Sequence, residues 1–273
     1  MLNMFAKKTF KNFLYIRYFP DTVPKLKAIV FVFSKLFFSP LLFFKPDTYF
    51  KILSKIASMR LNCVIFTPQG KFFCRNFDDF WVISPNYEKE FLPYFECEKN
   101  RVFIDVGAHI GKYTVLMAKK AEKVISIEPY SENFKILEYN VKINDLKNVI
   151  LVKRACSDKI GSTKLYISKD NTGGHSLNEK TKFYENINTS TLEKICEENK
   201  IEPSQICLIK IDVEGHEKAV LEGSKNILMN VKNLRIIFES WKEIEETRSF
   251  LKSFGFIVKK IGERYYLAEK YEK

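Results

Sequence analysis

The alternation of strand-like and helix-like segments after residue 100 is the feature that most constrains the fold of this 273-residue chain. Short apolar runs rich in Val and Ile alternate with segments whose apolar residues recur at helical spacing. This order predicts an α/β fold with a doubly wound, mostly parallel sheet. In such sheets, ligands bind beyond the carboxyl ends of the strands, where the strand order reverses.

The apolar runs and the helical periodicity give bounds for each expected element. The predicted parallel strands are 102–106, 123–127, 148–152, 205–213 and 234–238. The predicted helices are 110–121, 131–140, 217–228 and 242–254, and the chain closes with a hairpin of 256–260 and 264–269. The run over 205–213 is almost continuously apolar, which favours a central strand. Ser131 is the expected N-cap of its helix.

Positive charge is concentrated in the first quarter of the chain. Residues 1–75 contain 13 Lys and Arg against two acids, a net charge of +11. Residues 76–273 contain 32 basic and 31 acidic residues, so the remainder carries only +1. A nucleic-acid partner is therefore not expected for most of the chain.

Residues 1–60 are expected to form a basic, aromatic-rich extension. Residues 28–44 are apolar at 13 of 17 positions but contain Lys35 and Pro40, and a membrane span needs about 20 apolar residues. The 14 aromatic residues within 1–50, interleaved with lysines, suit an anionic membrane surface. One alternative is that the extension forms a helical cap on the catalytic domain or on a second subunit. Another is that it forms a transmembrane segment.

The cysteine spacing argues against a zinc site, because no CxxC pair occurs. The six cysteines are Cys63, Cys74, Cys97, Cys156, Cys196 and Cys207. We expect reduced core thiols. The first apolar run also starts late and lacks a small-residue cleavage site, unlike a signal peptide. These features predict a cytoplasmic protein, peripheral at the inner face of the membrane if its N-terminal extension binds lipid.

A glycine turn follows the first predicted strand and carries the first candidate ligand site. Asp105 precedes Gly107 and Gly111, and Glu128 ends the second strand. Glycine lets a ligand approach the backbone, and a carboxylate can accept both hydroxyl protons of a ribose. The spacing is not G-x-G-x-x-G, so a nucleoside bearing an ammonium group fits better than a dinucleotide. The alternative is a purely structural turn with a solvated acid.

Several motifs together resemble the FkbM family of S-adenosylmethionine-dependent methyltransferases. They are DVGAHIG at 105–111, Glu128-Pro129, RACSD at 154–158 and LIKIDVEGHE at 208–217. The resemblance covers roughly residues 85–240. It implies a seven-stranded, Rossmann-like class I methyltransferase fold, S-adenosylmethionine as cofactor, and O-methylation, often of sugar hydroxyls.

The resemblance also implies roles for individual residues. The implied cofactor-binding residues are Asp105, Gly107, Ala108 and Gly111 at the methionine end, Glu128 and Pro129 at the ribose, and Cys156 and Ser157 beside the adenine.

The end of the fourth predicted strand carries the candidate catalytic acids. Asp212 and Glu214 lie there, and clustered carboxylates raise one another's pKa, which could make either one a general base. His175, in a glycine-containing loop, is the third candidate, as a substrate contact or a base. Glu214 could instead stabilise a helix N-terminus. Asp212 with Glu239 could hold a divalent cation, but no required metal is expected.

We therefore expect an O-methyltransferase whose acceptor is a hydroxyl of a glycan, a glycolipid or a related small molecule. The alternatives are a nucleic-acid methyltransferase that uses the basic arm, and a catalytically inactive membrane-associated scaffold. The expected domains are an extension (1–60), a lead-in of strands and helix (61–100) and a methyltransferase domain (101–273). Assembly into a homo-oligomer stays open.

Overall fold

The computed structural model describes residues 60–85, 87–168, 171–240 and 244–271, together with Thr48 and Ile52. Within these residues, no helix is both long and apolar enough to cross a bilayer. The expectations for the N-terminal extension, membrane binding or a cap, fall outside the described residues. The chain divides into two compact units, one of 1–87 with 169–172 and one of 88–168 with 173–273.

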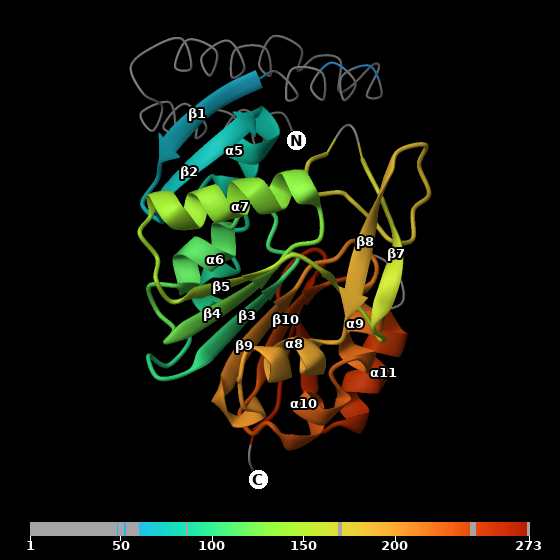
Figure 1. Cartoon of the computed structure of the whole chain (residues 1–273). Helices are drawn as coiled ribbons and strands as arrows, with labels where there is room; N and C mark the ends of the chain where they lie inside the picture. The colour runs from blue at the N-terminus through green and yellow to red at the C-terminus, as the bar shows by residue number, and fades with distance from the viewer. Residues whose placement is uncertain are drawn as a thin grey trace. The chain divides into compact units, whose positions relative to one another are not determined.

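The described part of the first unit is a hairpin followed by a helix (Figure 1). Strand β1 (Arg60–Phe66) pairs antiparallel with β2 (Lys71–Asn76), and α5 (Phe77–Ile83) follows directly. The Asn76 side chain caps α5 by accepting the backbone N–H of Asp79. The buried Asp79 carboxylate in turn accepts two bonds from the Arg75 guanidinium, each 2.8 Å long.

The second unit is built on a seven-stranded sheet with the order β11-β12-β10-β9-β3-β4-β5. The strands are β3 (Val102–Val106), β4 (Lys123–Ile127), β5 (Val149–Val152), β9 (Ile206–Ile211), β10 (Arg235–Glu239), β11 (Ile257–Lys260) and β12 (Tyr265–Glu269). β12 runs opposite to the other six strands of this sheet, which share one direction. The predicted doubly wound, mostly parallel sheet is confirmed, and its strand order reverses between β3 and β9.

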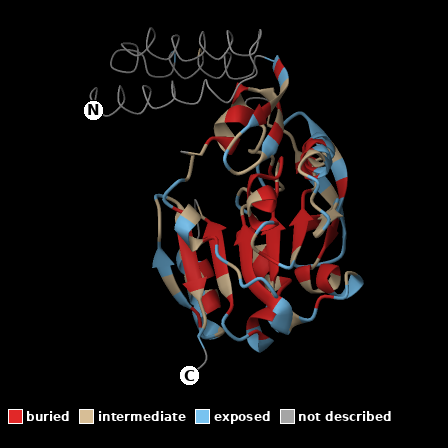
Figure 2. Cartoon of the chain, turned by 90° about the vertical axis from the view of Figure 1, so that its left-hand side faces the viewer, coloured by how far each residue is buried: buried red, intermediate tan, exposed pale blue. Residues whose placement is uncertain are grey.

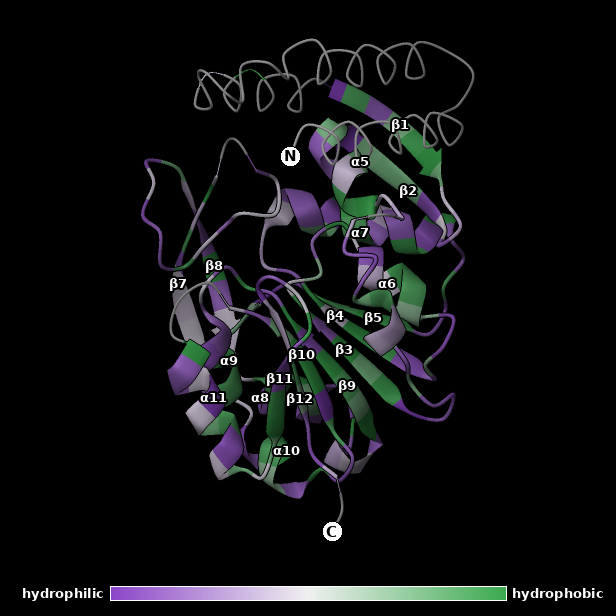
Figure 3. Ribbon diagram, turned by 180° about the vertical axis from the view of Figure 1, so that it is seen from behind, coloured by the Kyte–Doolittle hydropathy of each residue, from purple (hydrophilic) through white to green (hydrophobic). Residues whose placement is uncertain are grey.

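Helices cover both faces of this sheet (Figure 1). One face carries α6 (Lys112–Met117) and α7 (Ser131–Ile143), and the other carries α8 (Leu192–Glu198), α9 (Glu217–Glu222), α10 (Lys225–Asn230) and α11 (Ile244–Ser253). Every residue of β3 and β9 is buried (Figure 2). Phe103 packs with α6, whereas Ile104 packs with α8 to α11, as the alternation of side chains along a strand requires. The sheet is accordingly the most hydrophobic layer of the unit (Figure 3).

The predicted helix over 217–228 is wrong, because the chain forms two short helices that are separated at Gly223 and Ser224. A Cβ atom at Gly223 would lie 2.1 Å from the carbonyl oxygen of Ser157, so the backbone passes too close for any side chain. The predicted helix over 110–121 is shorter than expected, since α6 covers only Lys112–Met117.

The N-cap of α7 is also not the predicted one. Tyr130 occupies that position, and Ser131 is the first helical residue. The Ser131 hydroxyl donates to the carboxylate of Glu185 instead of capping the helix.

A second sheet was not predicted. Strands β6 (Ala155–Cys156), β7 (Gly161–Tyr166) and β8 (Tyr184–Ser190) form it, in the order β6-β8-β7. In β7 only Leu165 is buried. The strand therefore lacks the apolar run by which the other strands were found.

The prediction that all six cysteines are reduced is wrong for one pair. Cys97 and Cys207 form a disulfide, with Cα atoms 5.9 Å apart and a sequence separation of 110 residues. Cys207 lies on the central strand β9, and the fold brings Cys97 against it. The other four cysteines are not disulfide-bonded. Because disulfides are rare in reducing compartments, this pair removes one support for the cytoplasmic expectation.

Replacing Gly223 with Ala should destabilise the second unit by roughly 2–3 kcal/mol, because the new methyl group would overlap the Ser157 carbonyl oxygen. Urea unfolding measures the change. Gly161→Ala is the matched control, since a Cβ there would meet only the Thr189 Oγ1 atom, at 3.6 Å. Equal stability of the two variants would contradict the close approach at Gly223.

Candidate functional site

The candidate site lies where the carboxyl ends of β3, β4 and β9 meet. The backbone N–H of Gly107 and that of Ala108 both donate to the Ile127 carbonyl at 3.0 Å, which ties the glycine turn to β4. On the other side, a Cβ atom at Gly107 would lie 1.8 Å from the Asp212 carbonyl oxygen. Gly107 has φ +76°, so glycine is required for both space and conformation. The expected residues of three strands therefore converge.

A buried lysine that the sequence analysis missed lies at the centre of this convergence. Lys210 Nζ donates to the Gly107 carbonyl at 2.8 Å. It also lies 3.6 Å from Asp105 Oδ1 and 3.4 Å from Asp212 Oδ2. Burial disfavours its charge, but Asp212 and Asp105 outweigh that effect and raise the pKa of Lys210. The ammonium group therefore stays charged between the two carboxylates.

Asp105 is fully buried at the end of β3. Its Oδ2 atom accepts the Thr114 hydroxyl at 2.8 Å, whereas its Oδ1 atom accepts no hydrogen bond within the described part of the chain. Burial raises the pKa of Asp105, and Lys210 opposes that rise. Among the described residues, Lys210 Nζ is the cation nearest to Oδ1, at 3.6 Å, so this oxygen takes part in an ion pair but accepts no short hydrogen bond.

Glu128 is buried after β4, and backbone amides orient its carboxylate. Its Oε2 accepts from His109 N and its Oε1 from Tyr130 N, both at 2.9 Å. His109 has φ +52°, a left-handed conformation that forms part of the glycine turn. Burial raises the pKa of Glu128 to about 7. Pro129 lies between Glu128 and Tyr130, in the short connection from β4 to α7.

Three carboxyl groups meet beyond β9 and β10. Ligand-type oxygens of Asp212, Glu214 and Glu239 all lie within 4.8 Å of one another, a spacing that could hold a divalent cation. Burial and the nearby Asp212 raise the pKa of Glu214 to about 8, and the same causes raise that of Glu239. Arg264 Nε lies 3.4 Å from Glu239 Oε1. A carboxyl group with a pKa near 8 is mostly protonated at pH 7, so only its ionised fraction, which grows as the pH rises, can accept a proton.

The loop that carries His175 reaches this site. The His175 ring packs edge-on against Tyr130, with centroids 4.3 Å apart, and its Nδ1 accepts from Ser168 N at 3.1 Å. The next residue, Ser176, donates its hydroxyl to the Glu214 carbonyl at 2.9 Å. The structure therefore brings His175 close to the turn of Glu128 and to the loop of Glu214.

The residues expected beside an adenine lie on β6 and just after it. Ser157 Oγ is 2.9 Å from His216 Nε2, which joins this segment to the loop after β9. The Cys156 side chain packs in the main hydrophobic core, and burial raises the pKa of its thiol. Only the backbone of Cys156 is thus left to contact a cofactor.

A second polar network, also missed from the sequence, lies near Lys210. Glu88 Oε2 accepts from Lys112 Nζ at 3.1 Å and from the Tyr113 hydroxyl at 2.6 Å. Its Oε1 accepts the Tyr265 hydroxyl at 2.5 Å. Lys210 Nζ lies 5.7 Å from the centroid of the Tyr113 ring. These residues come from distant segments, so no local pattern in the sequence links them.

Comparison with known proteins points to one family. The profile of the methyltransferase FkbM domain matches residues 105–258. The chain is 29% identical over 137 residues to the hexuronic acid methyltransferase AglP of Haloferax volcanii, a match that covers 50% of this chain and 55% of AglP. It is 34% identical over 68 residues to the tRNA (guanine(37)-N(1))-methyltransferase Trm5b of Pyrococcus abyssi, covering 24% of this chain and 21% of Trm5b.

Solved structures give a weaker likeness. The methyltransferase FkbM of Methylobacillus flagellatus is 13% identical with a TM-score of 0.48, covering 96% of this chain and 58% of that chain. The chain spans about half the length of AglP and about a fifth of Trm5b.

Replacing Lys210 with Met should destabilise the second unit by roughly 3–5 kcal/mol, because Asp105 and Asp212 would lose their buried counter-charge. Urea unfolding measures the loss. The double variant Lys210→Met/Asp105→Asn should recover part of it, since the uncompensated buried carboxylate is gone.

Lys225→Met is the control for Lys210, because Lys225 is exposed at the start of α10. We expect a change below about 0.5 kcal/mol for this variant. Strict additivity of the Lys210 and Asp105 substitutions would contradict the proposed charge pairing.

Proposed function

The chain belongs to the FkbM methyltransferase family, and we propose that it transfers the methyl group of S-adenosylmethionine to a hydroxyl of a glycan, a glycolipid or a related small molecule. The observation that carries this proposal is the convergence of the ends of β3, β4 and β9. It places Asp105, Glu128 and Asp212 around one glycine turn at the switch point of the sheet.

The residues present fit S-adenosylmethionine. Asp105 Oδ1 accepts no hydrogen bond in the described residues and faces Lys210 only at 3.6 Å, so it could accept a shorter bond from the ammonium group of a methionine moiety. Gly107, Ala108 and Gly111 would let that moiety approach the backbone. Glu128 accepts two backbone amides and a side-chain bond from Asn133, and its carboxylate keeps acceptor capacity for a ribose hydroxyl.

The adenine would lie near Ser157 and the backbone of Cys156. When bound, S-adenosylmethionine supplies an electrophilic methyl group on a sulfonium. The chain's own contribution is to align the acceptor with that methyl group and to take up a proton.

We assign the proton to the acid cluster. A neutral hydroxyl is a poor nucleophile, so a carboxylate that accepts its proton assists the transfer. Glu214, whose pKa is about 8, would take the proton in its ionised form, which becomes more abundant as the pH rises. Asp212 would position Lys210 and Glu239 around Glu214. His175 would contact the acceptor from the neighbouring loop.

A sugar acceptor is supported by the similarity to AglP, a hexuronic acid methyltransferase. Because this match covers only half of this chain, the identity of the acceptor is proposed and does not follow from the family. A nucleic acid is the second candidate, supported by the shorter match to Trm5b. The scaffold alternative is disfavoured, since the acids that the proposed chemistry needs are all present.

The acceptor class can be tested by incubating the protein with methyl-labelled S-adenosylmethionine and separate glycan, lipid and RNA fractions of its host. Label in the glycan or glycolipid fraction is the expected result. Label confined to RNA would favour the second candidate. No label in any fraction, from a protein that binds S-adenosylhomocysteine, would overturn the proposed acceptor.

Affinity for S-adenosylhomocysteine should fall as the pH falls through about 7, because the ionised Glu128 accepts hydroxyl protons and the protonated form accepts fewer. If only the ionised form binds, affinity at pH 6 should be about tenfold weaker than at pH 8. Calorimetric titration across this range measures the effect.

Glu128→Gln should bind weakly and without this pH dependence. Glu138→Gln is the matched control, since Glu138 is exposed on α7. An unchanged affinity and pH profile in Glu128→Gln would show that the ribose assignment is wrong.

A further inference from the structure

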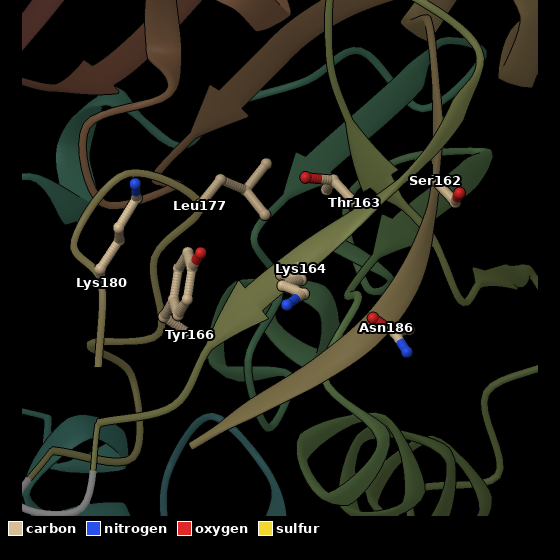
Figure 4. Close-up of a pocket in the computed structure, with 7 residues that line it drawn as sticks. All are labelled: Ser162, Thr163, Lys164, Tyr166, Leu177, Lys180 and Asn186. Carbon is tan, nitrogen blue, oxygen red and sulfur yellow. The ribbon is translucent and has the colours of Figure 1, made fainter. Parts of the chain in front are cut away.

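A polar pocket of about 430 Å³ lies on the small sheet of β6, β7 and β8 (Figure 4). It is lined by Ser162, Thr163, Lys164, Tyr166, Leu177, Lys180 and Asn186. None of these residues belongs to the proposed cofactor site or to the acid cluster. The volume falls within the range of about 300–1,000 Å³ that is typical of small-molecule sites. The proposed methyl-transfer chemistry therefore leaves this pocket unexplained.

The lining is positively charged and rich in hydrogen-bonding groups. Lys164 and Lys180 are its only charged residues, and no carboxylate lines it. Among the described residues neither lysine forms an ion pair with an acid. The other polar lining groups are hydroxyls and one amide, which both donate and accept. A ligand that matches this lining carries a negative charge and several hydroxyl groups.

Aromatic rings accompany the two lysines. Tyr166 and Tyr184 pack edge to face with centroids 6.4 Å apart, and Tyr184 is 49% exposed. Lys164 Nζ lies 4.0 Å from the centroid of the Tyr184 ring. In Figure 4, Tyr166 and Leu177 lie between Lys180 and Lys164. An exposed ring can pack against the C–H face of a sugar while its hydroxyl group forms hydrogen bonds.

The pocket shares one segment with the candidate active site. Tyr166 N donates to the Ser176 carbonyl at 2.9 Å, and Ser176 N donates back to the Tyr166 carbonyl at 3.1 Å. The Ser176 side chain bonds to the Glu214 carbonyl. His175 precedes Ser176 and Leu177 follows it, so neighbouring residues serve the active site and the pocket wall.

We propose that this pocket binds an anionic sugar unit of the acceptor, whose carboxylate pairs with Lys164 or with Lys180. This inference rests on the proposed glycan methyltransferase function and names the class of its substrate. An acceptor of more than one sugar unit would extend from the pocket, past the 175–177 segment, to the acid cluster. The pocket then selects uronic-acid-containing glycans over neutral ones through charge.

The test is a calorimetric titration of the full chain, without cofactor, with trigalacturonic acid and with the neutral trisaccharide maltotriose. We expect trigalacturonic acid to bind at least tenfold more tightly than maltotriose. Lys164→Gln/Lys180→Gln should lose at least tenfold of the trigalacturonate affinity. Lys225→Gln, which removes an exposed lysine on α10, should change nothing.

Three results would overturn the pocket assignment: no binding of trigalacturonic acid, equal binding of maltotriose, or equal losses in the double variant and in Lys225→Gln. Complete displacement by inorganic phosphate at the same concentration would also overturn it, since the site would then select anions and not sugars. The same samples are titrated with S-adenosylhomocysteine. Normal binding of that compound confines a failure to the pocket, whereas its absence overturns the proposed function.

Discussion

The rest of the site depends on the pairing of the buried Lys210 ammonium group with two carboxylates. This ammonium group lies among the carboxylates of Asp105 and Asp212 and the carbonyl oxygen of Gly107. An isolated carboxylate at the buried end of β3 would be strongly unfavourable, and Lys210 makes its ionised form tolerable. The same group joins the two central strands at the point where the strand order reverses. Lys210 thus both holds the glycine turn in position and balances the charge of the site.

Beyond this lysine, the fold holds acids closer together than stability alone would favour. Asp212, Glu214 and Glu239 crowd one another, and burial adds to their repulsion. Because burial and crowding raise the pKa values of Glu214 and Glu239, their contribution to stability is largest at low pH and is lost as the pH rises through those values. The extensive apolar packing of the central sheet offsets this local cost. Such local conflicts are expected where a protein does chemistry.

Local patterns in the sequence correctly predicted the features that depend on neighbouring residues, such as the strands and their ends. The strands 102–106 and 123–127 match the structure residue for residue, and the strand-end rule correctly brought Asp105 and Glu128 to one edge of the sheet. Long-range contacts explain the rest. Lys210 sits inside an apolar strand, where a single lysine carries no signal of its two partners. Likewise, the break at Gly223 depends on a carbonyl group from a distant loop.

The disulfide between Cys97 and Cys207 has a consequence for the connectivity of the site. It closes a covalent ring that contains Asp105, Glu128, Ser157 and His175, while the acid cluster lies on the open chain that follows. A single backbone cut within the ring leaves one covalently joined molecule. After such a cut, the proposed cofactor residues and the proposed catalytic acids would stay tethered at a high effective concentration and could reassemble as an intramolecular pair.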